Sequence, residues 1–165
     1  MTNAPRTMLS FVVGPNRFNC RVAGIALRQG RVLTCREDDD DWVMLPGGRV
    51  EMGEPSPVAL AREIVEELDC TAEIGPLVYT VENFFDRAGE RFHEIGLYYR
   101  VILPDAFPYL PEGVCFETED EGHRLYFEWV DAEPLALRRI NLKPSWLGER
   151  LALLPAAAQH LVMHE

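Results

Sequence analysis

Glutamates and glycines are concentrated between Leu45 and Cys70, in the sequence LPGGRVEMGEPSPVALAREIVEELDC. Glu63, Glu66 and Glu67 are spaced i, i+3 and i+4, so a helix beginning near Ser56 would carry them on one face. These like charges repel each other, and those in the last helical turns also oppose the helix dipole. Mg²⁺ prefers oxygen ligands and would relieve both penalties. The spacing therefore favours a divalent-metal site over the alternative, a glutamate-rich surface helix.

The helix is expected to position these carboxylates by packing its opposite face on a sheet. Ser56 and Pro57 suit the N-cap and the first helical position. At about 100° per residue, a helical wheel separates two arcs. The apolar arc holds Val58, Ala61, Ile64, Val65 and Leu68, and the other holds Ala59, Glu63, Glu66, Glu67 and Cys70. We expect the carboxylate arc to face a cleft or solvent.

Strand patterns alternate with helical patterns along the chain, which predicts an α/β fold with a mixed sheet covered by helices. Gln29-Gly30 and Ala88-Gly89 are expected turns, and the long acidic segment before residue 124 is expected to be a loop that serves the site. The expected strands are 18–26, 31–36, 42–45, 71–81, 91–103 and 126–130. A short helix or turn is expected at 131–137, a helix at 144–154, and a further strand or helical segment at 159–164.

Composition limits the classes of function. At 165 residues, nearly half of them hydrophobic, the chain is expected to form one domain, residues 1–165. Its net charge of −11, with Lys143 as the single lysine, argues against binding long nucleic acids. An acidic protein can still bind a small phosphorylated substrate, because a bound cation reverses the local charge. The acidic run Glu37–Asp41 is expected to be a solvated loop.

The cysteines and the N-terminus indicate a cytoplasmic protein without a membrane anchor. Four cysteines lie without a CxxC pair, so they are expected to be buried free thiols and not zinc ligands. Residues 1–8 are expected to be a loose arm, and the following apolar run is too short for a signal sequence or a membrane span. The apolar C-terminal segment and the region of Trp146 are candidate homodimer surfaces.

The stretch from Leu45 to Cys70 resembles the Nudix box, which reads G, five residues, E, seven residues, then R-E-U-x-E-E-x-G-U with U aliphatic. The residues in register are Gly48, Glu54, Arg62, Glu63, Ile64, Glu66 and Glu67. Asp69 replaces the usual glycine, and aspartate is one of the few other residues that tolerate a left-handed C-cap. Cys70 replaces an aliphatic residue. The resemblance implies an α/β/α sandwich of the Nudix type with a mixed sheet.

The resemblance also implies the roles of the box residues. Glu66 and Glu67 would be the principal metal ligands, joined by the Gly47 carbonyl, with Mg²⁺ as the ion or Mn²⁺ in its place. Glu63 would be a further ligand, directly or through water, or the catalytic base. Arg62 would hold the carboxylates in position, and Glu54 would support the corner between loop and helix.

A base outside the box is the alternative to Glu63, because some family members carry it in a late loop before a strand. Glu119 and Glu121 occupy such a segment, and Glu94 is a third candidate. The alternative for Glu119 and Glu121 is a solvated acidic loop, and the alternative for Glu94 is a structural partner on a strand. Aromatic side chains would stack on a base and arginines would bind phosphates. The substrate-binding candidates are Arg21, Arg49, Phe84 and Phe85, followed by Phe18, Tyr79, Arg36, Arg87 and Arg91.

The resemblance implies a hydrolase that cleaves the pyrophosphate bond of a nucleoside diphosphate linked to a second group. A metal lowers the pKa of the attacking water and neutralises phosphate charge, while a carboxylate takes the proton. Two other classes are the alternatives: a nucleotide-sensing module of the same fold without turnover, and a scaffold that binds only metal. The intact set of Arg62, Glu63, Glu66 and Glu67 favours the enzyme.

Overall fold

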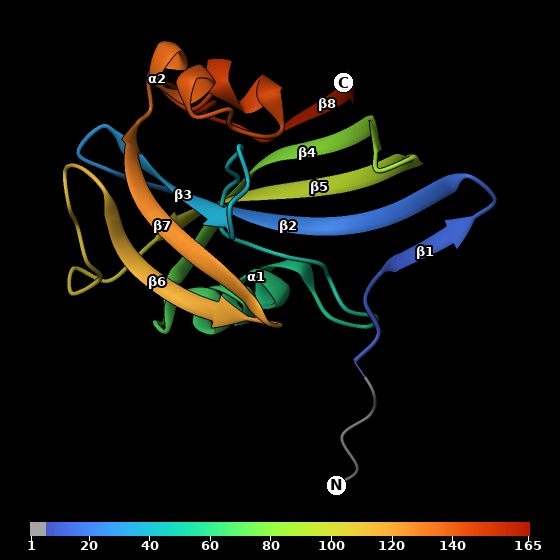
Figure 1. Ribbon diagram of the computed structural model, residues 1–165, viewed down its shortest axis with the longest axis horizontal. Helices are drawn as coiled ribbons and strands as arrows, with labels where there is room; N and C mark the ends of the chain where they lie inside the picture. Colours follow the sequence, from blue (N-terminus) through green and yellow to red (C-terminus); the bar gives the residue numbers. More distant parts are fainter. Residues whose placement is uncertain (1–5) are drawn as a thin grey trace, which may run out of the picture.

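The structure is a computed structural model that describes residues 6–165, which form a mixed sheet flanked by short helices (Figure 1). None of the helices in this part of the chain is long and apolar enough to cross a membrane. The elements in chain order are β1 (Ser10–Val13), β2 (Asn16–Arg28), β3 (Arg31–Glu37), α1 (Ser56–Leu68), β4 (Glu73–Arg87), β5 (Glu90–Ile102), β6 (Val114–Asp120), β7 (His123–Asp131), α2 (Pro134–Arg139), the 3₁₀ helix η1 (Ser145–Glu149) and β8 (Gln159–His164).

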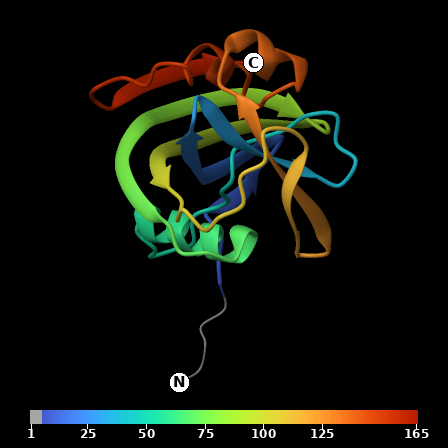
Figure 2. The same ribbon diagram turned by 90° about the vertical axis from the view of Figure 1, so that its left-hand side faces the viewer.

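The sheet has the strand order β6-β7-β3-β2-β5-β4-β8, and β1 pairs with the first half of β2. The β2–β5 and β4–β8 pairs are parallel, and the other pairs are antiparallel. Helix α1 lies on one side of the curved sheet, while α2 and η1 lie on the other (Figures 1 and 2). This arrangement confirms the α/β fold with a mixed sheet between helical layers.

Two hydrophobic cores hold the layers together. On one side, Leu60, Ile64 and Leu68 of α1 are buried in a cluster that includes Val22 and Phe127 of the sheet. The second cluster combines sheet residues with Leu137 of α2, Trp146 and Leu147 of η1, and Leu151 after η1. Trp146 is therefore a core residue and not the dimer surface that the sequence suggested.

The start and the buried face of α1 differ from the prediction. Pro55 is the N-cap, Ser56 is the first helical residue, and the Ser56 hydroxyl bonds to the Tyr99 hydroxyl at 2.7 Å. Val58 and Val65 are 54% and 49% exposed. The buried residues of the helix are Ala59, Leu60, Glu63, Ile64, Glu67 and Leu68. The predicted separation into an apolar face and a carboxylate face was wrong, because the tertiary fold buries two glutamates beside the leucines.

Other predicted boundaries also change. The expected strand 42–45 is reduced to isolated bridges at Val43 and Met44, and the expected helix 144–154 is only the short η1. The expected acidic loop contains β6, which forms a hairpin with β7. The expected strand 71–81 becomes the longer β4, the expected strand 91–103 agrees with β5 to within one residue at each end, and the two strands pair directly. The cysteines are free thiols as predicted, but the expectation that they are buried holds only for Cys35, because the other three are half-buried.

Part of the predicted N-terminal arm is attached to the protein. Residues 1–5 of that arm lie outside the described part of the chain. Arg6 forms ion pairs with Glu51 and Glu66, and Met8 makes a bridge with Glu51. The expectation of a loose arm was therefore wrong for Arg6 to Met8, which bind to the loop before α1.

Candidate active site

Two glycines bring the loop before α1 close to both β2 and the helix. Gly47 has a φ of 142°, and a Cβ atom there would collide with the Val22 backbone of β2. A Cβ on Gly48 would occupy the position of the Glu63 carboxylate. The Gly48 carbonyl accepts a 2.9 Å hydrogen bond from the Val22 amide. Glycine is therefore required at both positions for this close packing.

Arg62 organises the carboxylates at the corner between this loop and α1. Its guanidinium binds Glu54 through two hydrogen bonds of 3.0 Å. It also donates to Glu63 at 2.7 Å and to Glu66 at 3.0 Å. The bond to Arg62 lowers the pKa of Glu54, and the same interactions raise the pKa of Arg62 further above its usual value. A planar guanidinium can hold several carboxylates in fixed positions in this way.

Glu67 is the most deeply placed carboxylate of the group, with only 8% of the residue exposed. Its Oε2 accepts a 3.0 Å hydrogen bond from the Gly47 amide. Burial raises the pKa of Glu67 to about 8, and the neighbouring Glu63 adds to the rise. Burial also raises the pKa of Glu63, against the opposing effect of Arg62. Two buried acids are thus held side by side with one nearby arginine.

These side chains fit a hard divalent cation. The carboxylates of Glu63, Glu66 and Glu67 and the Gly47 loop supply only oxygen donors, which suit Mg²⁺ and Mn²⁺. Gly48 leaves the space beside Glu63 free of any side chain. A cation here would compensate the buried negative charge that raises the pKa values of Glu63 and Glu67. These residues therefore fit the divalent cation that the sequence implied.

Asp38 belongs to a separate, more exposed group of titratable side chains, which lies where β3 ends and β7 begins. Its carboxylate accepts hydrogen bonds from the Arg124 amide at 2.9 Å and bonds to His123 at 2.7 Å. Glu37 lies 3.4 Å from the same histidine. Among the described residues, these three side chains have their ligand atoms close enough for a metal ion. Asp38 thus binds the backbone of β7, while the run Glu37–Asp41 leaves the end of β3 as a largely exposed turn, in agreement with the solvated loop expected from sequence.

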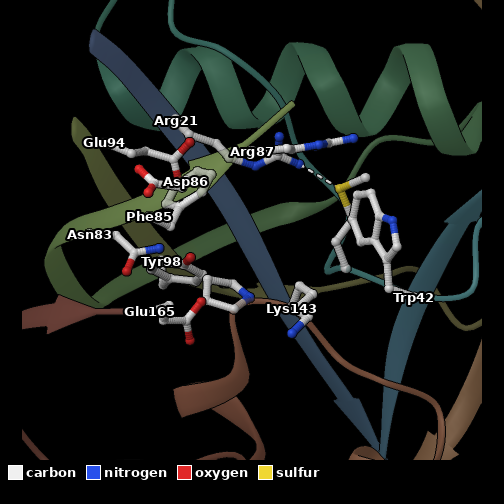
Figure 3. Close-up of a pocket in the computed structure, with 12 residues that line it drawn as sticks. Arg21, Trp42, Asn83, Phe85, Asp86, Arg87, Glu94, Tyr98, Lys143 and Glu165 are labelled. Atoms are coloured by element: carbon white, nitrogen blue, oxygen red, sulfur yellow. Dashed lines mark hydrogen bonds between the residues drawn. The ribbon is translucent and has the colours of Figure 1, made fainter. Parts of the chain in front are cut away.

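A cavity of about 400 Å³ is lined by residues of β2, β4 and β5 together with Trp42 and Met44 (Figure 3). Arg21 of β2 connects the two regions, because it lines the cavity and its Nη2 lies 3.4 Å from the Gly47 carbonyl. Phe85 also lines the cavity. The structure thus brings Arg21 and Phe85, two of the predicted substrate-binding residues, to one hollow beside the carboxylates.

The other predicted substrate-binding residues have different surroundings. Phe84 stacks on both His93 and His164 and borders a second hollow with Phe85. The Arg49 side chain reaches the Met8 sulfur, and its carbonyl accepts a bond from Arg62. Of the secondary candidates, Tyr79 is a core residue, Phe18 stacks on Phe11, Arg36 stacks on Tyr126, Arg91 borders the second hollow, and Arg87 lines the cavity.

The late acidic residues are placed on the β6–β7 hairpin. Glu119 is an exposed residue of β6, and Glu121 lies in the turn with a φ of 47°. The charge of Asp120, between them, is one of the causes of the raised pKa of Glu67. Alternation along β6 puts Phe116, Thr118 and Asp120 on one face of the strand, and Phe116 packs against the core that contains α1. Sequence reasoning missed Asp120 because the segment was expected to be a loop.

Comparison with known proteins identifies the family. The sequence model of the NUDIX domain matches residues 18–147, which include the complete arginine–carboxylate group and the cavity strands. The chain belongs to the Nudix family. A "MutT-like protein" from Streptomyces ambofaciens is 34% identical over 70 residues, which cover 42% of this chain and 46% of that protein. The match to this Nudix relative thus spans less than half of its length.

Solved Nudix structures share the fold. A mutator MutT protein from Bacillus halodurans has a TM-score of 0.62 at 17% identity, covering 88% of this chain and 89% of that one. A UDP-X diphosphatase has a TM-score of 0.58 at 17% identity, over 87% of this chain and 66% of that chain. An ADP-ribose pyrophosphatase from Streptococcus suis has a TM-score of 0.55 at 13% identity, over 88% and 98%. These likenesses confirm the Nudix fold.

Proposed function

We propose that this Nudix protein is a Mg²⁺-dependent pyrophosphohydrolase, which cleaves the diphosphate of a nucleoside diphosphate linked to a second group. The observation that carries the proposal is the arrangement of Arg62, which binds Glu63 and Glu66 while Glu67 lies buried against the Gly47 amide. A pyrophosphatase and a diphosphatase among the structural neighbours support the same class of reaction.

In this proposal, Glu66, Glu67 and the Gly47 carbonyl hold the ion, and Glu63 either joins them or takes the proton from the attacking water. When bound, Mg²⁺ neutralises phosphate charge and lowers the pKa of water, and Mn²⁺ would do the same. Arg62 keeps the glutamates oriented. Glu67 must release its proton before it can bind the cation, because only the carboxylate is a good ligand.

The alternative base on the β6–β7 hairpin stays a prediction. Glu119 and Glu121 were the candidates from sequence in this segment, and the structure adds Asp120, whose charge is one of the causes of the raised pKa of Glu67. Glu94 lines the cavity, which suits a substrate-binding role better than taking the proton from the attacking water. Glu63 is therefore our first candidate for the general base, and the acidic residues of the β6–β7 hairpin are the alternatives.

The second candidate function is a nucleotide-binding module without turnover. The cavity beside the carboxylates would suit such a module, but a pure binder has no need for three carboxylates organised by one arginine. We also propose that residues 1–165 act as one cytoplasmic domain on a small nucleotide-derived substrate, without membrane or long nucleic-acid partners. A homodimer is part of this proposal, and light scattering on the purified protein tests it.

The decisive experiment is a product assay over a panel of nucleotides, nucleotide sugars, ADP-ribose and dinucleoside polyphosphates. Each reaction is run with Mg²⁺, with Mn²⁺ and with EDTA. We expect a nucleoside monophosphate to be released only when a divalent ion is present. Ligand-induced thermal stabilisation without product for any substrate would contradict the enzyme and favour the binding module.

A further inference from the structure

The cavity beside the Nudix carboxylates opens toward them at Arg21. The Arg21 guanidinium donates to the Met44 sulfur at 2.9 Å and lies 3.4 Å from the Gly47 carbonyl. A molecule in the cavity can therefore extend past Arg21 to the carboxylate group. The volume of about 400 Å³ is within the roughly 300–1,000 Å³ typical of small-molecule sites. The cavity is thus large enough for the part of a nucleotide that carries no reacting phosphate.

Two buried polar side chains lie next to each other in this cavity. Asn83 of β4 and Glu94 of β5 are direct partners in the antiparallel register, so their side chains are on the same face. They are only 3% and 8% exposed. Asn83 Oδ1 has no hydrogen-bond partner, and no residue between 6 and 165 makes a hydrogen bond or ion pair with the Glu94 carboxylate. Buried polar groups without partners are costly, which indicates that a ligand supplies them.

Aromatic side chains form the remaining walls. Trp42 lies across the cavity from Asn83 and Glu94, and Phe85 and Tyr98 lie beside that pair (Figure 3). Arg87 stacks on the Trp42 ring at 4.9 Å from its centroid. Flat aromatic walls with a polar edge are suited to a planar heterocycle, which stacks on the rings and directs its hydrogen-bonding edge at the polar pair.

We propose that this cavity recognises guanine, with the Glu94 carboxylate accepting from the ring N1–H and the exocyclic amino group. The inference rests on the proposed function, since it names the nucleoside part of the substrate. A carboxylate is an acceptor only, and its two oxygens are best matched by two adjacent donors. The unpartnered Asn83 Oδ1 can then accept from the second N–H of the guanine amino group. Arg21 lies between the base and the phosphates that meet the metal.

The other common bases match this pair less well. Adenine and cytosine present one amino group next to a ring nitrogen that is itself an acceptor. Uracil presents one N–H between two carbonyl oxygens. In each case a second acceptor would face the Glu94 carboxylate and remain unpaired, and unpaired buried groups are a strong source of selectivity. Hypoxanthine retains the guanine N1–H and O6 but lacks the amino group, which makes it a matched probe.

Isothermal titration of GMP, IMP, AMP, CMP and UMP tests the assignment, with parallel measurements in Mg²⁺ and in EDTA. We expect GMP to bind most tightly and IMP to bind about tenfold or more weakly, because a hydrogen bond to a charged group is lost. Glu94→Gln should reduce the GMP-to-IMP ratio to near one. Glu73→Gln makes the same change at an exposed residue of β4 outside the cavity and should leave the ratio intact.

Equal affinity of the wild-type protein for GMP, IMP and AMP would overturn the assignment, as would absence of binding by all five or an unchanged ratio in Glu94→Gln. If that variant does not fold, the comparison of GMP with IMP on the wild-type protein decides alone. Monophosphates are not hydrolysed, so the result is independent of turnover. A GMP preference without hydrolysis of any diphosphate contradicts only the proposed enzyme. Hydrolysis without a base preference contradicts only the guanine site.

Discussion

The backbone amide of Gly47 donates a 3.0 Å hydrogen bond to Oε2 of Glu67, and this bond links the glycine loop to the buried end of α1. Gly47 contacts β2 on its other side, where a Cβ would meet the Val22 backbone. The position of Glu67 is therefore fixed by the sheet as well as by the helix. A carboxylate held in this way requires little reorganisation when a cation binds.

Glu67→Gln keeps the size of the side chain but removes its negative charge. We expect hydrolysis to fall by about 10²–10⁴-fold, the range typical of losing one essential proton-transfer or electrostatic group. The measurement is kcat/KM with a substrate found in the panel, at saturating Mg²⁺. Glu73→Gln, on an exposed residue of β4, is the matched control. Wild-type activity in the Glu67 variant would remove this residue from the metal site.

The raised pKa of Glu67 predicts how the metal-free protein responds to pH. The carboxyl ionises near 4.5 in the unfolded chain but at about 8 in the folded protein. The folded state therefore binds more protons between these values, so its stability should fall as pH rises through this window. Denaturant unfolding in EDTA from pH 5 to pH 8 measures the slope.

Glu67→Gln should flatten this slope, because glutamine does not titrate; an equally steep slope would contradict the raised pKa of Glu67. Glu63 contributes in the same direction, since burial also raises its pKa, so some slope should persist in the variant. Mg²⁺ binding must displace the proton. The stabilisation by Mg²⁺ should therefore increase with pH toward 8 in the wild-type protein.

Arg62→Lys tests whether the planar guanidinium is required. Lysine keeps the charge but cannot bind Glu54 through two parallel bonds while also reaching Glu63 and Glu66. We expect activity to fall about 10–100-fold, as for residues that orient metal ligands. Arg17→Lys is the control, because Arg17 forms a similar two-bond pair with Glu90 away from the site. Equal effects of the two changes would indicate a purely structural role.

Gly48→Ala adds one methyl group where the Glu63 carboxylate now lies. We expect Glu63 to be displaced, with at least a tenfold loss of Mg²⁺ affinity, because misplacing a ligand by a fraction of an ångström is sufficient. Calorimetric titration with Mg²⁺ is the measurement. Gly148→Ala is the control, since a Cβ there meets only Leu137 at an ordinary 3.9 Å. Unchanged Mg²⁺ affinity in Gly48→Ala would show that Glu63 is not at the ion.

Local sequence patterns were sufficient to predict most of the strands and the Nudix box. The turns at Gln29-Gly30 and Ala88-Gly89 were predicted, and both residues before the glycines adopt positive φ values. Asp69 adopts the left-handed C-cap conformation expected where the family has glycine, with a φ of 50°. These features depend on short stretches of chain, whose conformational preferences a sequence expresses directly.

The burial of α1 and the cavity could not be predicted in the same way. A helical wheel assigns glutamate to solvent, but here the glycine loop and Arg62 provide partners that allow Glu63 and Glu67 to be buried. Asn83 and Glu94 are eleven positions apart in sequence, and only the β4–β5 register makes them neighbours. Strand β6 was missed because its acidic residues concealed the alternation along a half-exposed strand.

The sequence by itself determined the family of this protein, because the Nudix box is a set of residue types at fixed spacing along one helix and its preceding loop. The tertiary structure decided the environment of the box, including the burial of Glu67. It also decided which strand residues surround the cavity next to Arg21. Burial and cavity shape depend on contacts between distant segments, and these are set by strand register and layer packing, which no local pattern contains.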